Sequence, residues 1–234
     1  MSKTTASTAK SHDLTQGSIA KTMLLFALPT LGSSALQSLN GSINAVWVGR
    51  FLGEEALAAT ANGNILMFIL ISFVFGFGMA ATILIGQAMG RRNDTMVKKT
   101  MGTALGSIIP ISILVSAIGW LFAPLLLNLL GTPASAVELA LTYLRMIFVA
   151  MPVTLTFTLI MMALRGTGDS TTPLWFIIIS VIIDLILTPV LILGIGPFPE
   201  WGIFGSAFAT AVANALAMIG MIVTMYLGGC VLTL

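Results

Sequence analysis

The chain has 234 residues, of which 57% are hydrophobic and only 8% are charged. Soluble globular domains carry about 25% charged residues, so this composition cannot build a water-exposed surface and most of the surface is expected to face lipid. The net charge of +2 is too small to indicate a nucleic-acid partner, and the single cysteine, Cys230, excludes an intrachain disulfide.

The first 15 residues are rich in serine, threonine and lysine and contain no hydrophobic run. A cleavable secretory signal needs such a run, so none is predicted there. We expect residues 1–15 to be a disordered cytoplasmic tail. Residues 16–234 are expected to form one transmembrane lobe.

Six stretches are long and apolar enough to cross a bilayer, since a spanning helix needs about 20 mostly apolar residues. The connections between them, such as residues 50–55, are short and polar, and none could hold a soluble domain. The predicted fold class is therefore an all-α integral membrane protein with six transmembrane helices. The expected spans are approximately 22–47, 57–85, 101–127, 137–163, 173–193 and 201–227.

Basic residues gather on one side of the predicted spans, which indicates the cytoplasmic side. The N-terminus is therefore expected in the cytoplasm, beneath a plasma membrane of the bacterial inner-membrane type. The last span has no basic residue at its cytoplasmic end, which favours a sequence that continues beyond Leu234. One side holds Lys3, Lys10, Lys21, Arg91, Arg92, Lys98, Lys99 and Arg165, and the other holds Arg50 alone.

The first span has a polar face formed by Ser33, Gln37, Asn40 and Asn44, whose spacings of 4, 3 and 4 place them on one side of a helix. Such side chains are not tolerated against lipid, so the face must contact protein or water. It is interpreted equally as a cavity lining or as a set of interhelical hydrogen bonds. Pro29, one turn earlier, is predicted to kink the helix.

Two charged residues lie well inside predicted spans, Arg145 in the fourth and Asp184 in the fifth. A charge at a span centre costs roughly 2.5–3.5 kcal/mol on insertion scales, so each needs a reason. Asp184 is favoured as a protonatable carboxylate, neutral when protonated and able to bind a cation when ionised. The structural alternative is an ion pair with Arg145, which lies at a matching depth.

The fifth and sixth spans also have polar faces. Ser180, Asp184 and Thr188 repeat every four residues, and Thr210 and Asn214 lie one turn apart. Polar faces from three spans could therefore converge on one cavity.

Motifs for enzymatic chemistry are weak, and no cofactor is expected. The string from Gly166 to Asp169 matches the GxGD sequence of intramembrane aspartyl proteases. Asp169 falls in a predicted loop, however, and no preceding span supplies a partner aspartate. The pattern favours a carrier over an enzyme.

Several stretches resemble the multidrug and toxic compound extrusion (MATE) transporters, and the likeness covers nearly the whole chain beyond Leu14. Residues 164–173, with the sequence LRGTGDSTTP, are the most specific, being similar to the family's LRGxGDxxTP loop. Further similar stretches are residues 27–30, 48–59, 86–90, 143–145 and 205–210.

This resemblance implies secondary active export of small organic, often cationic, compounds in exchange for protons or sodium ions. The family has twelve helices in two related six-helix lobes, and this chain resembles the N-terminal lobe. The implied partner is a second lobe, either a C-terminal half or a second copy of the chain.

The resemblance also implies a coupling site. Asp184 and Thr210 match an aspartate of the fifth helix and a threonine of the sixth. Ser180 stands where the family has asparagine, and Asn44 stands where it has a first-helix aspartate. Asn44 can coordinate an ion through its carbonyl oxygen but cannot titrate, so coupling is expected to concentrate on Asp184.

Two alternatives stay open. The chain could be an incomplete or accessory membrane fragment that binds without transporting. It could also be a flippase for lipid-linked precursors, although such a protein would favour a more cationic cavity than one with Arg145 as the single basic residue inside a span.

Overall fold

The computed structural model describes residues 18–196, 199–227 and 232, and nearly all of them are helical. The tail predicted at residues 1–15 lies outside the described residues. Five helices are long and apolar enough to cross a membrane, which makes the chain a multi-pass membrane protein. In chain order they are α1 (Ile19–Gly90), α2 (Asp94–Leu129), α3 (Val137–Gly166), α4 (Thr171–Leu193) and α5 (Gly202–Leu227).

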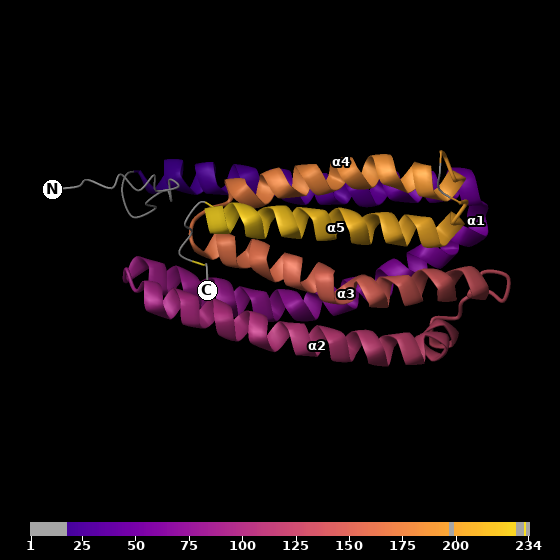
Figure 1. Ribbon diagram of the computed structural model, residues 1–234, viewed down its shortest axis with the longest axis horizontal. Coiled ribbons are helices and arrows are strands. Elements are labelled where there is room, and N and C mark those ends of the chain that lie inside the picture. Colours follow the sequence, from indigo (N-terminus) through magenta and orange to yellow (C-terminus); the bar gives the residue numbers. More distant parts are fainter. Residues whose placement is uncertain (1–17, 197–198, 228–231, 233–234) are drawn as a thin grey trace.

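The helix α1 crosses the bundle twice. Its 72 residues would extend about 108 Å if straight, whereas the hydrocarbon core of a bilayer is about 30 Å thick. The backbone leaves helical geometry at Gly53, with φ 85° and ψ −174°, a conformation that glycine adopts readily. Figure 1 shows α1 reversing direction at the end of the bundle marked by its label.

We call residues 19–52 the first half of α1 and residues 54–90 its second half. They contain the first two predicted spans. The polar connection predicted at residues 50–55 is helical except at Gly53, because one residue with positive φ is enough to turn the chain.

Local capping groups set the ends of α2 and α4. The side chain of Asn93 accepts a hydrogen bond from the backbone N–H of Met96 at 3.0 Å, at the start of α2. The carboxylate of Asp169 accepts from the N–H groups of Thr171 and Thr172, both at 3.0 Å, at the start of α4. Gly194 ends α4 in the left-handed conformation, with φ 65°.

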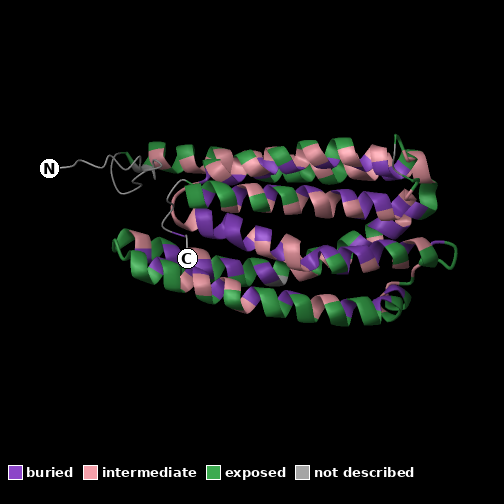
Figure 2. Cartoon of the chain, in the orientation of Figure 1, coloured by how far each residue is buried: buried purple, intermediate pink, exposed green. Residues whose placement is uncertain are grey.

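The helix α3 lies between two groups of helices (Figure 1). The first half of α1 runs beside α4 and α5, and the second half of α1 runs beside α2. Side chains of α3 belong to both hydrophobic clusters of the core, as Leu144 does in one and Leu164 in the other. Figure 2 shows buried positions concentrated along α3, whereas the outer faces of its neighbours are exposed, as expected for surfaces that meet lipid.

Small residues let two neighbours approach α3 closely. On α2, a Cβ atom added at Gly119 would overlap the ring of Phe148. On the other side, a Cβ added at Gly166 would lie 2.9 Å from the carbonyl oxygen of Thr82 in α1. The hydroxyl of Thr82 also donates a hydrogen bond of 2.9 Å to the carbonyl of Met162. α3 is therefore closely packed against both neighbours.

Candidate functional site

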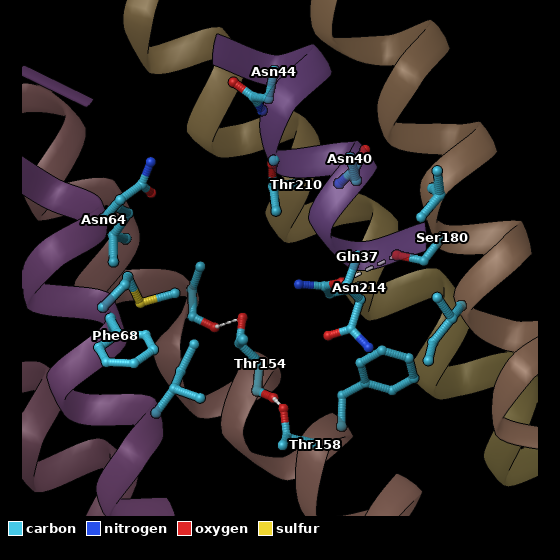
Figure 3. Close-up of a pocket in the computed structure, with 18 of the residues that line it drawn as sticks. Gln37, Asn40, Asn44, Asn64, Phe68, Thr154, Thr158, Ser180, Thr210 and Asn214 are labelled. Atoms are coloured by element: carbon cyan, nitrogen blue, oxygen red, sulfur yellow. Dashed lines mark hydrogen bonds between the residues drawn. The ribbon is translucent and has the colours of Figure 1, made fainter. Parts of the chain in front are cut away.

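A cavity of about 410 Å³ opens between both halves of α1 and the helices α3, α4 and α5 (Figure 3). Its volume falls within the range of about 300–1,000 Å³ that is usual for small-molecule pockets. Its wall combines amides and hydroxyls with aromatic, aliphatic and methionine side chains. Such a mixture suits organic molecules that are partly apolar.

The first half of α1 supplies three amides to this cavity. Gln37, Asn40 and Asn44 line it, as the polar face of the first span predicted. The prediction fails for Ser33, which is fully buried, is not among the lining residues and donates a 2.8 Å hydrogen bond to the carbonyl of Pro29. The serine hydroxyl is satisfied within its own helix and needs no water.

Pro29 lies inside α1, whose one recorded departure from helical dihedral angles is at Gly53. The helix therefore continues through this proline without a break. The missing N–H of Pro29 leaves the carbonyl of Leu25 without its usual helical donor, and the bond from Ser33 goes to the carbonyl of Pro29 instead.

Asp184 lies at the junction of α1, α4 and α5. Its side chain is 2% exposed. The Nδ2 of Asn40 donates to Oδ2 at 2.7 Å, and the hydroxyls of Thr210 and Thr188 donate to Oδ1 at 3.0 and 3.2 Å. Three neutral donors thus surround one carboxylate, and two of them, Asn40 and Thr210, also line the cavity.

The other two predicted coupling residues contact different groups. The hydroxyl of Ser180 donates to Oδ1 of Asn214 at 3.0 Å. Asn44 accepts from the hydroxyl of Ser206 through its Oδ1 at 2.9 Å. Of the residues assigned with Asp184 to coupling, the structure brings Thr210 to the carboxylate, whereas Asn40 takes the position expected of Asn44.

Arg145 does not pair with Asp184. Its guanidinium carbon lies 4.7 Å from the centre of the Trp120 ring on α2, which is a cation–π contact. No ion pair between the two is present in the described part of the chain. The ion pair considered as the structural alternative for Asp184 is therefore not formed, and the side chain is contacted by neutral donors.

The helix α3 also lines the cavity, which was not predicted from the sequence. Tyr143, Ile147, Ala150 and Thr154 line it, and the same face continues to Arg165 near the end of the helix. The spacings of 4, 3 and 4 at the start of this series indicate one helical face. Most of these residues are apolar, so the sequence does not distinguish this face from ordinary core positions.

The chemistry available at the junction is limited to one titratable group. Among the described residues, no three His, Cys, Asp or Glu side chains gather in a way that could hold a metal ion. An ion bound beside Asp184 would be held by one carboxylate and by neutral oxygens of the surrounding hydroxyls and amides. A proton would instead bind directly to the carboxylate.

Comparison with known proteins gives a consistent result. The family model described as MatE matches residues 29–190. The "Probable multidrug resistance protein YoeA" of Bacillus subtilis is 39% identical over 206 residues, which cover 88% of this chain and 44% of that protein. The "FAD transporter" of Shewanella oneidensis is 31% identical over 207 residues, covering 88% of this chain and 46% of that protein.

Solved structures agree on the fold. The outward-facing conformation of a multidrug resistance MATE family transporter superposes with a TM-score of 0.86 at 20% identity, covering 95% of this chain and 48% of that one. The chain thus spans about half the length of the relatives it matches.

Proposed function

The chain belongs to the MatE family, and from that premise we propose that it is the N-terminal half of a secondary active exporter of small organic, often cationic, compounds. Export would be driven by inward movement of protons or sodium ions. One relative is named for multidrug resistance and another for a flavin dinucleotide, so this proposal leaves the substrate class broad.

The observation that carries the proposal is the placement of Asp184. An ionised carboxylate only accepts hydrogen bonds, and here it accepts three. On protonation one oxygen gains an O–H that needs an acceptor, and the loss of the negative charge weakens the three bonds that it accepts. Nδ2 of Asn40 cannot accept, and its amide must rotate or withdraw if it faces the new O–H. Binding a proton would thus alter a cavity-lining residue of α1.

Binding of an ion and binding of a substrate are coupled when both change the same equilibrium. Asn40 and Thr210 face the cavity and also bond Asp184, so a substrate that contacts either one alters the carboxylate's surroundings. The same contacts that bind a compound would therefore change the affinity of Asp184 for the ion. Exchange of the two across the membrane requires this linkage.

We place the chain in a bacterial plasma membrane with its N-terminus in the cytoplasm. The support is the bias of Lys and Arg toward the end of the bundle where α1 ends and α2 begins, marked by Arg91, Arg92, Lys98 and Lys99. We call this the Arg91 end.

Because the chain spans about half the length of its relatives, we propose that it works with a second six-helix lobe. That lobe could be a C-terminal half or a second copy of this chain, and alternating access would come from rocking of two lobes around the cavity. The alternative is a fragment that binds compounds without moving them. Measuring the mass of the complex in detergent together with flux on the same preparation distinguishes these cases.

The substitution Asp184→Asn tests the proposal, because asparagine keeps the shape of the side chain but cannot exchange a proton. We expect cells producing the variant to lose gradient-driven export of ethidium while the protein still inserts in the membrane in normal amounts. Asp94→Asn, at the exposed start of α2, is the matched control and should export normally.

Normal ethidium export by Asp184→Asn would refute the assignment of Asp184. Collapsing the proton gradient and the sodium gradient separately identifies the coupling ion, since only one of the two treatments should stop export by the unchanged protein.

A further inference from the structure

The last residue of the cavity-lining face of α3 is an arginine. Thr154, Thr158 and Met161 line the cavity in successive turns, and Arg165 continues the same face one turn later. At about 1.5 Å per residue, Arg165 lies about 16 Å beyond Thr154 along the helix axis. A fixed positive charge is thus placed at the Arg91 end of the cavity.

The guanidinium of Arg165 has no partner among the described residues. Its Nε is buried without a hydrogen bond, and no ion pair or cation–π contact involves the side chain within that part of the chain. Leaving the buried Nε–H without an acceptor is costly, and the half-buried side chain lines the cavity, where its other donors can reach a ligand. Arg145 also has a buried Nε without a bond, but its guanidinium lies over the ring of Trp120.

The acidic groups that could neutralise Arg165 are engaged elsewhere. Asp169, four residues later, uses its carboxylate to bond the first residues of α4. Asp184 is bonded by Asn40 and two threonines, and it is not among the residues that line the cavity. Arg165 is consequently the one charged side chain among the described lining residues.

The cavity wall is rich in rings and sulfur. Phe68, Phe75 and Phe157 line it, together with Met161 and Met162. Aromatic faces pair with other rings, and methionine sulfur makes favourable contacts with aromatic groups. A flat aromatic body would find partners here that a simple aliphatic ion would not.

We propose that the Arg91 end of the cavity binds the anionic group of an aromatic compound, a carboxylate or a phosphate, through the guanidinium of Arg165. The inference rests on the proposed export function and narrows its substrate class, because it adds a negatively charged group to compounds that are otherwise described as often cationic. A planar guanidinium can bind either anion with two parallel hydrogen bonds, which also orients the attached ring.

Two flavins test the proposal, because flavin mononucleotide and riboflavin share one ring system and differ by a phosphate. We would titrate each into the purified 234-residue chain in detergent without added phospholipid and follow flavin fluorescence. We expect flavin mononucleotide to bind about tenfold or more tightly than riboflavin, the preference usual for charge-assisted bonds.

Arg165→Gln should remove this preference, and Arg165→Lys should keep part of it because the charge remains. Arg91→Gln removes an exposed cation from the same end of the bundle and should leave the preference intact. A melting curve for each variant in detergent shows whether it is folded. The lysine variant keeps the test decisive if the glutamine variant is unstable.

Failure of flavin mononucleotide to bind, equal binding of both flavins, or a preference that survives Arg165→Gln would overturn the proposal. Phosphatidylglycerol is added in a second series because a lipid phosphate offers the same chemistry. If that lipid binds at Arg165 and flavin mononucleotide does not displace it, the site belongs to lipid and the proposal is wrong. Binding needs no ion gradient, so these outcomes are separate from those of the Asp184→Asn export assay.

Discussion

The helix α3 and the first half of α1 both line the cavity, yet they are packed very differently. More than half of the residues of α3 are buried, among them Phe148, which is 1% exposed. In the first half of α1, Ser33 and Val48 are the buried positions among the described side chains. Leu24, at 62%, and Leu31, at 65%, are largely exposed there.

The difference in packing suggests that α3 is the fixed helix of the bundle and that the first half of α1 is the helix that can respond to an ion. α3 has apolar and glycine contacts on several sides, so any displacement would disturb close packing. The first half of α1 buries few side chains and adds polar contacts to its apolar ones, such as Asn40 with Asp184 and Asn44 with Ser206. Polar contacts can exchange partners without leaving a cavity, which suits a helix that responds to an ion.

The largest effect on stability is expected from Gly119→Ala, which would break the packing of α3. The added methyl group would overlap the buried ring of Phe148. Overpacking typically costs about 1–3 kcal/mol, and so short a contact points to the upper end. The measurement is thermal unfolding in detergent.

Gly106→Ala on the same helix is the control, because a Cβ there meets no atom within 4 Å. It should leave stability unchanged or raise it slightly, since alanine favours helices. Combining Gly119→Ala with Phe148→Leu should recover part of the loss. Equal melting temperatures for the two alanine variants would contradict the close contact described between α2 and α3.

A smaller effect is expected from Asn40→Ala, which tests the polar contact between the first half of α1 and Asp184. It removes the 2.7 Å bond to the carboxylate of Asp184. Hydrogen bonds to charged groups contribute about 1.5–3 kcal/mol in proteins, and bonds between membrane helices are usually at or below the lower end. We expect a modest loss of stability and a large loss of ion-coupled export.

Asn44→Ala is the matched variant, because Asn44 bonds Ser206 and has no hydrogen bond to Asp184. Its export should fall less than that of Asn40→Ala. The opposite order would favour the position that the family resemblance assigned to coupling and would count against the contacts seen in the structure.

The smallest effect is expected from Thr82→Val, which removes the bond from the second half of α1 to the carbonyl of Met162. Interhelical bonds of this kind contribute about 0.6 kcal/mol on average. Thr224→Val is the control, since the hydroxyl of Thr224 bonds only within its own exposed helix segment. A melting-temperature difference between the two that is within error would show that this bond adds nothing to the packing between α1 and α3.

Much of the fold could be predicted because long apolar stretches have few structural options in a bilayer. An all-helical membrane protein and its membership of one transporter family follow from composition and from motifs such as residues 164–173, and the comparisons confirm both. The turn at Gly53 was harder to foresee. A polar stretch with two glutamates and an arginine resembles a loop, but helical hydrogen bonding persists on both sides of one glycine.

The polar residues of the site could be predicted from the sequence, but their hydrogen-bond partners could not. Helical spacing identified Gln37, Asn40 and Asn44 as one polar face, yet spacing cannot say which of two asparagines one turn apart meets Asp184. That depends on how far α1 is displaced along α4, which only packing determines. Arg165 was predicted in a loop because the fourth span was expected to end at residue 163. In the structure α3 continues to Gly166, so Arg165 lies on the helix.

The hydrogen bonds that satisfy the polar face of α1 join residues that are far apart in the sequence. Asn40 and Asp184 are 144 residues apart, and Asn44 and Ser206 are 162 residues apart. A ribosome makes α1 before α4 and α5, so these amides enter the bilayer long before their partners exist. Unsatisfied polar groups in hydrocarbon are costly, so water or the insertion machinery must shelter them until residue 206 has been synthesised. The helix α1 is consequently synthesised before its polar partners and completes its packing only after they exist.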